Sequence, residues 1–271
     1  MRASAPAKIN LALVVGPLRA DGKHELVTVY QRLGLADRIE VEPAASFRVD
    51  GFLADTLVRG ALEALAARAG VEPHWRAHIE KRLPVAAGLG GGSSDAATAL
   101  RLANATLPEP LPAAELHELA AGLGADVPFF LADGPQLGMG DGSELTPVDV
   151  PQDFWILLLL PHDAQKQSTG SVYAAFDARD GAAGFDERRV ALRDGLAAVR
   201  RPRDLAALPG NDLASSPLAE ELRALGAFRA DVSGAGPSVY GLFHHKPAAS
   251  AAQRSLKRLG RIWITAPAWY G

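Results

Sequence analysis

Two kinds of hydrophobic pattern, one with the period of a strand and one with the period of a helix, follow each other irregularly along this chain. Short apolar runs or strict alternation predict strands over residues 9–15, 38–42, 74–83, 154–160, 230–232 and 239–243. Helical spacing of apolar residues predicts helices over residues 56–69, 93–105, 113–123, 169–177, 217–225 and 248–259. Because strands and helices mix without regular alternation, the pattern predicts an α+β fold rather than a doubly wound parallel sheet.

A change of pattern near residue 150 predicts a domain boundary. Pro147 and Pro151 come shortly before the apolar strand of residues 154–160, and prolines of this kind separate elements. The length of 271 residues fits one large domain or two modest ones. We therefore predict an N-terminal domain over residues 1–150 and a C-terminal domain over residues 151–271.

Composition and charge exclude several classes of protein. The chain has 48% hydrophobic and 22% charged residues, which is ordinary for a globular protein and excludes a disordered chain. Its 28 basic and 31 acidic residues give a net charge of -3, so nothing global favours nucleic acid or an anionic membrane as a partner. The absence of cysteine excludes disulfides, a thiol nucleophile and cysteine-bound metal.

Nothing in the sequence predicts insertion into a membrane or secretion. The most apolar stretch, residues 154–160, is far shorter than the roughly 20 residues of a membrane-spanning helix. The first residues are interrupted by Lys8 and Asn10 before any hydrophobic core of a signal peptide develops. The expected location is therefore the cytoplasm, whereas the oligomeric state is left open.

A glycine-rich segment is the main chemical signal. Four of the five residues 88–92 are glycines, between a predicted strand and a predicted helix that begins at Ser93 and Ser94, which are suited to cap it. Glycines let backbone N–H groups approach an anion closely, and a helix N-terminus adds donors and a positive dipole end. The serine hydroxyls could bind phosphate oxygens or magnesium. A flexible surface turn is the competing interpretation.

The glycine-rich segment differs from other known phosphate loops. No lysine stands where a Walker A loop needs one, and the glycine spacing of a dinucleotide-binding fingerprint is not met. The His-Arg-Asp and Asp-Phe-Gly motifs of protein kinases are also missing from the sequence. The segment therefore predicts a phosphate site of another kind.

Five motifs in fixed order resemble the GHMP kinase superfamily and, within it, the 4-diphosphocytidyl-2-C-methyl-D-erythritol kinase family. They are Pro-Ala-Lys-Ile-Asn-Leu at 6–11, Arg-Ala-Asp-Gly-Lys-His at 19–24, the glycine-rich segment 88–94, Gly-Ala-Asp-Val-Pro-Phe-Phe at 124–130 and Ser-Gly-Ala-Gly-Pro at 233–237. The resemblance implies a two-lobed chain with an N-terminal ATP-binding lobe and a ferredoxin-like C-terminal lobe. It also implies that ATP, with Mg²⁺, phosphorylates the 2-hydroxyl of a cytidine diphosphate derivative on the non-mevalonate route to isoprenoid precursors.

The resemblance assigns roles to individual residues. Asp126 is the expected general base and Lys8 its cationic partner. The expected nucleotide-binding residues are Pro84, Val85, Ala86, Ala87, Gly88, Leu89, Gly90, Gly91, Gly92, Ser93 and Ser94. The expected substrate contacts are Asn10, His24, Tyr30, Thr169 and Tyr173. Asn10 lies two residues from Lys8, so on a strand both side chains share one face.

Each of these assignments has a structural alternative. Asp126 could accept backbone hydrogen bonds in a loop, and Lys8 could extend from a strand end into solvent. His24 could be a solvated turn residue, and Thr169 could cap a helix. In the family the residue before this histidine is usually tyrosine, whereas this chain has Lys23. Two other functions are also open, namely a GHMP kinase acting on homoserine or mevalonate and a nucleotide-binding module without catalysis.

Overall fold

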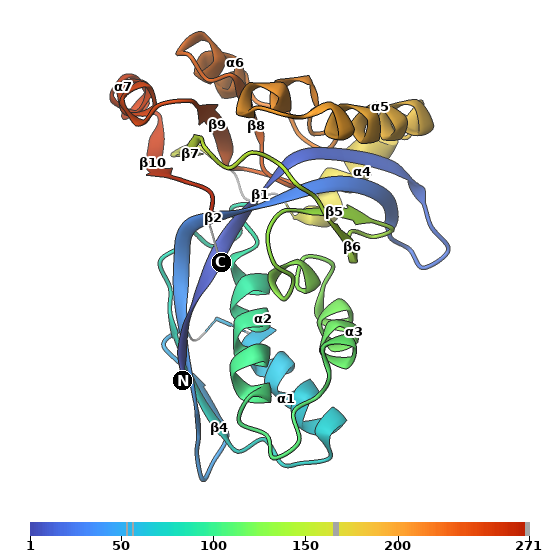
Figure 1. The fold of residues 1–271 in the computed structure, drawn as a ribbon, viewed down its shortest axis with the longest axis vertical. Coiled ribbons are helices and arrows are strands. Elements are labelled where there is room, and N and C mark those ends of the chain that lie inside the picture. The colour runs from blue at the N-terminus through green and yellow to red at the C-terminus, as the bar shows by residue number, and fades with distance from the viewer. Residues whose placement is uncertain (53, 56, 165–167, 269–271) are drawn as a thin grey trace. The chain divides into compact units, whose positions relative to one another are not determined.

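The computed structural model describes residues 1–52, 54–55, 57–164 and 168–268, which form two compact units (Figure 1). Unit 1 contains Met1–Ala7, Leu35–Val85 and Gly90–Asp133, and unit 2 contains Lys8–Gly34, Ala86–Leu89 and the rest of the chain from Gly134. Two long strands, β1 (Arg2–Leu18) and β2 (His24–Pro43), contribute residues to both units. The units interleave along the sequence, and the domain boundary near residue 150 stays a prediction.

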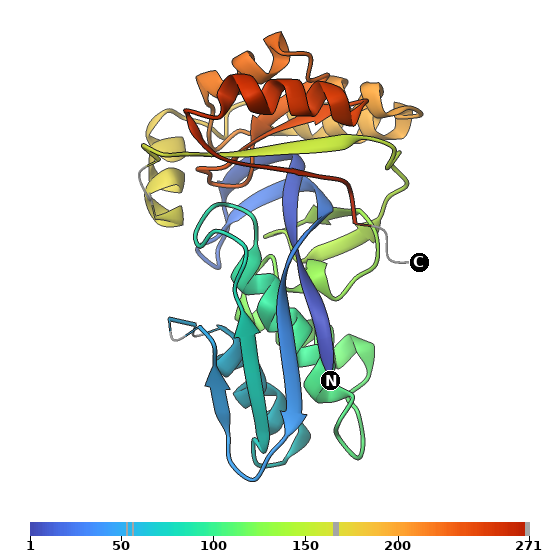
Figure 2. The ribbon, with the colours of Figure 1, turned by 90° about the vertical axis from the view of Figure 1, so that its left-hand side faces the viewer.

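Unit 1 packs helices against a small sheet. The central strand β4 (Trp75–Glu80) is antiparallel to β2, and β3 (Arg48–Asp50) runs parallel to it on the other side. Helices α1 (Leu57–Ala69) and α2 (Gly91–Asn104) lie on one face of these strands, as Figure 2 shows. The unit is completed by α3 (Ala113–Leu123) and the 3₁₀ helix η1 (Pro128–Phe130).

Small and apolar side chains explain the close packing of this unit. In α1 the buried residues recur at helical spacing, and Leu62 and Leu65 are completely buried. In α2 four of the ten buried residues are alanines, whose small side chains allow two helices to approach closely. The predicted helix over residues 56–69 is confirmed from Leu57 onward, and residue 56 lies outside the described part.

The first part of unit 2 is built on the paired strands β1 and β2. Strand β5 (Gln136–Met139) pairs with β2 and with β6 (Glu144–Pro147). Both long strands extend well beyond the predicted residues 9–15 and 38–42. The apolar run of β1 is buried at every position from Ala5 to Gly16, so it has no alternating pattern from which its length could be predicted.

The second sheet of unit 2 is antiparallel, with the order β10-β7-β9-β8. Its strands are β7 (Trp155–Pro161), β8 (Arg229–Val232), β9 (Val239–Phe243) and β10 (Gly260–Thr265). The helices of this part are α4 (Thr169–Ala178), α5 (Phe185–Ala198), the 3₁₀ helix η2 (Pro202–Ala207), α6 (Pro217–Ala224) and α7 (Lys246–Leu256). The strand order is that of a ferredoxin-like sheet, and the α+β class is confirmed.

The start of α2 differs from the prediction. The helix begins at Gly91, and its N-cap is Gly90, which has a left-handed backbone (φ 67°) and no capping side chain. Ser93 and Ser94 therefore lie within the first turn, and the prediction that they cap the helix is wrong. Glycine takes the cap position because this backbone conformation strains residues with a Cβ.

No helix in the described ranges is long and apolar enough to cross a membrane.

Candidate active site

The first half of the glycine-rich loop is fixed against a second glycine turn within unit 2. Ser233 Oγ donates to the carbonyl oxygen of Gly88 over 2.8 Å, and the backbone N–H of Ser238 donates to the carbonyl of Ala87 over 3.2 Å. Gly88 has a left-handed backbone (φ 76°), and a Cβ there would lie 2.2 Å from the carbonyl oxygen of Ser233. This close approach explains why the position requires glycine.

Strand β1 brings two of the expected site residues to the same place. The backbone N–H of Lys8 donates to the carbonyl of Leu89 over 2.9 Å. Lys8 Nζ donates to Asn10 Oδ1 over 2.8 Å, and Asn10 Nδ2 donates to Thr28 Oγ1 over 2.7 Å. Both side chains are buried, so Lys8 does not extend from a strand end into solvent. The two side chains share one face, as expected from their spacing.

The glycine turn of residues 233–237 lies against these two side chains. A Cβ on Gly234 would be 3.6 Å from Lys8 Nζ and 3.5 Å from Asn10 Oδ1. The Tyr30 ring is buried, and its centroid lies 5.5 Å from Lys8 Nζ, close enough for a cation–π contact. Lys8, Asn10 and Tyr30 therefore converge within unit 2, next to Gly88 and Gly234.

His24 lies in an aromatic and acidic environment. Its ring stacks on Tyr173 with centroids 4.8 Å apart, and it meets the edge of Phe176. His24 Nε2 is 2.8 Å from Asp177 Oδ1, and the histidine is only 7% exposed, which excludes a solvated turn residue. The neighbouring Lys23 forms an ion pair with Asp141.

Thr169 is the first residue of α4, and the capping group is its neighbour. Ser168 Oγ accepts a hydrogen bond from the backbone N–H of Ser171 over 3.0 Å. The alternative role of Thr169 as a helix cap is therefore wrong, because the preceding serine satisfies that donor. A substrate contact at Thr169 stays a prediction.

The second half of the glycine-rich loop belongs to unit 1 and forms the N-terminus of α2. The first N–H groups of a helix lack intrahelical acceptors, so this turn presents donors to an anion. Ser94 Oγ is buried and, within the described ranges, has no hydrogen-bond partner. An unsatisfied buried hydroxyl at a helix N-terminus fits a phosphate or its magnesium ion, because either would supply the missing interaction.

A largely buried charge cluster, which was not predicted, consists of Asp37, Lys81 and, on α2, Asp95. Lys81 Nζ donates to Asp37 Oδ2 over 2.7 Å and to Asp95 Oδ2 over 2.6 Å. Asp37 Oδ1 also accepts the backbone N–H groups of Arg82 and Leu83, which lead into the loop. A sequence signal existed, because Asp95 interrupts the otherwise small and apolar face of α2.

Burial and charge repulsion change the acid–base behaviour of this cluster. Burial, reinforced by the nearby Asp37 carboxylate, raises the pKa of Asp95 to about 7 although Lys81 acts in the opposite direction. Burial opposes the charge on Lys81, but its two carboxylate partners outweigh burial and raise the pKa of Lys81. The Asp95 carboxyl group therefore titrates near neutral pH.

Asp126 lies in the turn that joins α3 to η1 in unit 1. Its neighbours Val127, Phe129 and Phe130 are buried, whereas Asp126 itself is partly exposed. Lys8 belongs to unit 2, so the pairing of Lys8 with Asp126 stays a prediction.

Comparison with protein families identifies the class. Residues 56–134 match the GHMP kinases N terminal domain, and residues 214–262 match the GHMP kinases C terminal domain. A crystal structure of mevalonate kinase has a TM-score of 0.75 at 13% identity, covering 99% of this chain and 100% of that one, which shows a shared fold. The fold and the glycine-rich loop thus define an ATP-dependent small-molecule kinase of the GHMP class.

More similar relatives identify the family within this class. The 4-diphosphocytidyl-2-C-methyl-D-erythritol kinase of Salinispora tropica is 40% identical over 262 residues, which cover 88% of this chain and 82% of the relative. The same kinase of Geobacter sulfurreducens is 36% identical over 97% of this chain and 96% of the relative. A crystal structure of 4-(cytidine 5'-diphospho)-2C-methyl-D-erythritol kinase is 32% identical, with a TM-score of 0.80 and full coverage of both chains. The chain belongs to the 4-diphosphocytidyl-2-C-methyl-D-erythritol kinase family.

Proposed function

We propose that this kinase transfers the γ-phosphoryl group of ATP to the 2-hydroxyl of 4-diphosphocytidyl-2-C-methyl-D-erythritol, in the non-mevalonate route to isoprenoid precursors. The names of the relatives support this acceptor. The observation that carries the proposal is the buried Lys8–Asn10 pair beside Gly88 and Gly234, because it combines a cation, an amide and a close backbone approach in one place.

The chemistry assigned to the residues is general-base catalysis. Asp126 accepts the proton of the acceptor hydroxyl while the oxygen of that hydroxyl bonds to the γ-phosphorus. The bond from the γ-phosphorus to the β,γ-bridging oxygen breaks, which releases ADP. Lys8 supplies positive charge beside the base and the acceptor oxygen. Asn10 orients the acceptor through its amide, because it can both donate and accept a hydrogen bond.

In this proposal the glycine-rich loop binds the triphosphate of ATP, and the aromatic residues around His24 bind the cytosine of the acceptor. The triphosphate lies against residues 88–94, where Ser93 and Ser94 are the candidate partners of phosphate or Mg²⁺. Magnesium bound with ATP would neutralise phosphate charge. His24, with Tyr173 stacked on it, recognises the cytosine edge and face.

The test compares acceptors and one pair of variants. Purified protein should form ADP from ATP only when the cytidyl acceptor is present, and not with homoserine or mevalonate. Asp126→Asn should lower kcat by about two to four orders of magnitude, the usual effect of losing a general base. Asp153→Asn, a change at an exposed aspartate, is the matched control and should leave kcat unchanged.

Three outcomes would contradict the proposal. Turnover with homoserine or mevalonate would change the substrate, and ATP binding without turnover on any acceptor would indicate a non-catalytic module. Full activity in Asp126→Asn would reject the role of this residue as the base.

A further inference from the structure

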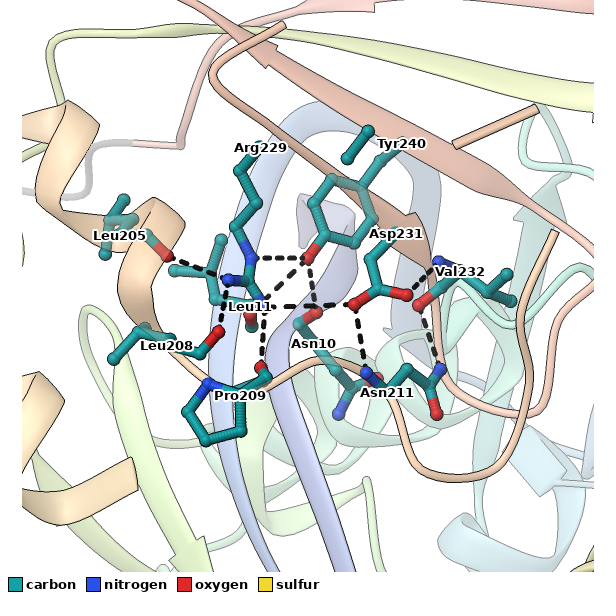
Figure 3. Close-up of polar contacts among 12 residues, drawn as sticks. Asn10, Leu11, Leu205, Leu208, Pro209, Asn211, Arg229, Asp231, Val232 and Tyr240 are labelled. Atoms are coloured by element: carbon teal, nitrogen blue, oxygen red, sulfur yellow. Dashed lines mark hydrogen bonds and ion pairs between the residues drawn. The ribbon is translucent and has the colours of Figure 1, made fainter. Parts of the chain in front are cut away.

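A buried polar network connects the C-terminal sheet of unit 2 to strand β1 (Figure 3). Tyr240 on β9 is completely buried, and its Oη donates to the main-chain carbonyl of Asn10 over 3.0 Å. Arg229 Nε on β8 donates to the same Tyr240 oxygen over 3.3 Å. The network therefore ends on the peptide of a residue whose side chain binds Lys8 Nζ.

Arg229 is satisfied mainly by backbone oxygens. Its Nη1 donates to the carbonyls of Leu205 and Leu208, each over 2.8 Å, and its Nη2 donates to the carbonyl of Pro209 over 2.7 Å. The guanidinium is only 6% exposed, and the Asp231 carboxylate lies 3.8 Å away. The cost of removing the Arg229 cation from water offsets much of its attraction to these acceptors, so its net contribution to protein stability is small. Its main effect is therefore to fix the positions of the groups that it binds.

A second branch of the network reaches the glycine turn. Asp231 Oδ2 accepts the backbone N–H of Asn211 over 2.9 Å. Asn211 Nδ2 donates to the carbonyls of Val232 and Gly234 over 2.9 and 2.7 Å. Gly234 is the residue on which an added Cβ would contact Lys8 Nζ and Asn10 Oδ1. Both branches therefore end beside the side chains of Lys8 and Asn10. The first ends at the main-chain carbonyl of Asn10, and the second ends at the carbonyl of Gly234.

We propose that Tyr240 and Arg229 are positioning residues for phosphoryl transfer, which set the placement of Lys8 and Asn10 by fixing the Asn10 peptide and, through Asp231 and Asn211, the Gly234 turn. This inference rests on the proposed function. The geometry supports it because the phenol donates to the carbonyl of Asn10 over 3.0 Å, with a longer contact of 3.4 Å to the carbonyl of Leu11, directly next to the Asn10 side chain that binds Lys8.

The protonation of Tyr240 agrees with this role. Burial raises the pKa of Tyr240 to about 12, and the nearby Arg229 only partly counteracts that effect. The phenol therefore remains a hydrogen-bond donor throughout the pH range in which the enzyme can be assayed.

Tyr240→Phe is the direct test, because it removes one hydroxyl and retains the buried ring. We expect kcat to fall roughly three- to tenfold, the range expected for loss of one buried hydrogen bond that orients reacting groups, while the KM for ATP stays within about twofold of wild type. Leu242→Val on the same strand is the matched control, since Leu242 is equally buried and lies opposite Arg229 on β8, but its side chain cannot form a hydrogen bond. It should lower the Tm by a similar amount without lowering kcat.

Amide hydrogen exchange tests the positioning role without the acceptor substrate of the kinase. Tyr240→Phe should increase amide exchange in a peptide that covers residues 8–12, and Leu242→Val should not. Arg229→Lys, which keeps the charge but loses the planar fork, should also increase exchange there, whereas Arg229 as a mere stabiliser would affect only the Tm.

The outcomes separate this inference from the proposed function. If the wild-type protein does not phosphorylate the cytidyl acceptor, the proposed function fails, and the exchange data alone decide about positioning. Wild-type exchange over residues 8–12 in Tyr240→Phe, or a kcat loss matched by Leu242→Val, would overturn the positioning role.

Discussion

Gly88→Ala should distort the glycine-rich loop more than an alanine substitution at any other glycine of that loop. Alanine would have to adopt a left-handed backbone (φ 76°), which costs about 1–2 kcal/mol. Its Cβ would also lie 2.2 Å from the carbonyl oxygen of Ser233 and 3.0 Å from that of Gly236. Backbone atoms cannot rotate away as a side chain can, so the loop must shift by about 1 Å and break the hydrogen bond from Ser233 Oγ, at a cost of about 1 kcal/mol.

The sum is about 2–3 kcal/mol, which should lower the Tm by about 4–6 °C in a protein of this size. Differential scanning calorimetry measures the Tm, and titration with an ATP analogue should show weaker binding because the loop has moved. Gly122→Ala is the matched control. Gly122 lies in α3, and a Cβ added there would have nothing within 4 Å, so alanine should leave the Tm equal or slightly higher. Equal Tm values and equal nucleotide affinity for the two variants would refute the steric argument.

The remaining predictions concern charged groups. Because the pKa of Asp95 is raised in the folded protein, its contribution favours folding at low pH and is lost as pH rises from about 4 towards 7, with little further change above that. Asp95→Asn removes this loss, so its Tm relative to wild type should increase between pH 5 and 7 and then stay constant; the slope is at most one proton, about 1.4 kcal/mol per pH unit. A difference in Tm between Asp95→Asn and wild type that does not change with pH would contradict a raised pKa of Asp95. Asp177→Asn should weaken the contact with His24 Nε2 and raise the KM for the acceptor a few-fold without changing the KM for ATP, as steady-state kinetics with each substrate varied in turn would show. An unchanged acceptor KM would mean that stacking on Tyr173 alone orients His24.

Local patterns predicted most elements of the fold. The helix over Ala113–Leu123 and the strand over Val239–Phe243 have the predicted bounds. The helix lies between Pro112 and Gly124, and the strand is a short apolar run that ends at His244. Helix α5 (Phe185–Ala198) was not predicted, since its surface is mostly charged and only Phe185 and Leu192 are buried. Strand β10 was not predicted either, because four of its six residues are only partly buried and do not alternate cleanly.

The candidate site shows the same division. Lys8, Asn10 and the glycine loop could be proposed from motifs, because their chemistry depends on residues that are adjacent in sequence. The start of α2 at Gly91 could not, since serines at 93 and 94 are better capping residues than glycine by propensity and the left-handed backbone of Gly90 decided otherwise.

Local spacing in the sequence is enough to predict the α+β class, the glycine-rich loop and the face shared by Lys8 and Asn10. Two sets of contacts do not follow from local spacing: Tyr240 donates to the peptide of Asn10, 230 positions away, and Lys81 binds both Asp37 and Asp95. These contacts depend on which strands and loops pack together. They are selected because a buried charge or donor left without a partner would cost free energy.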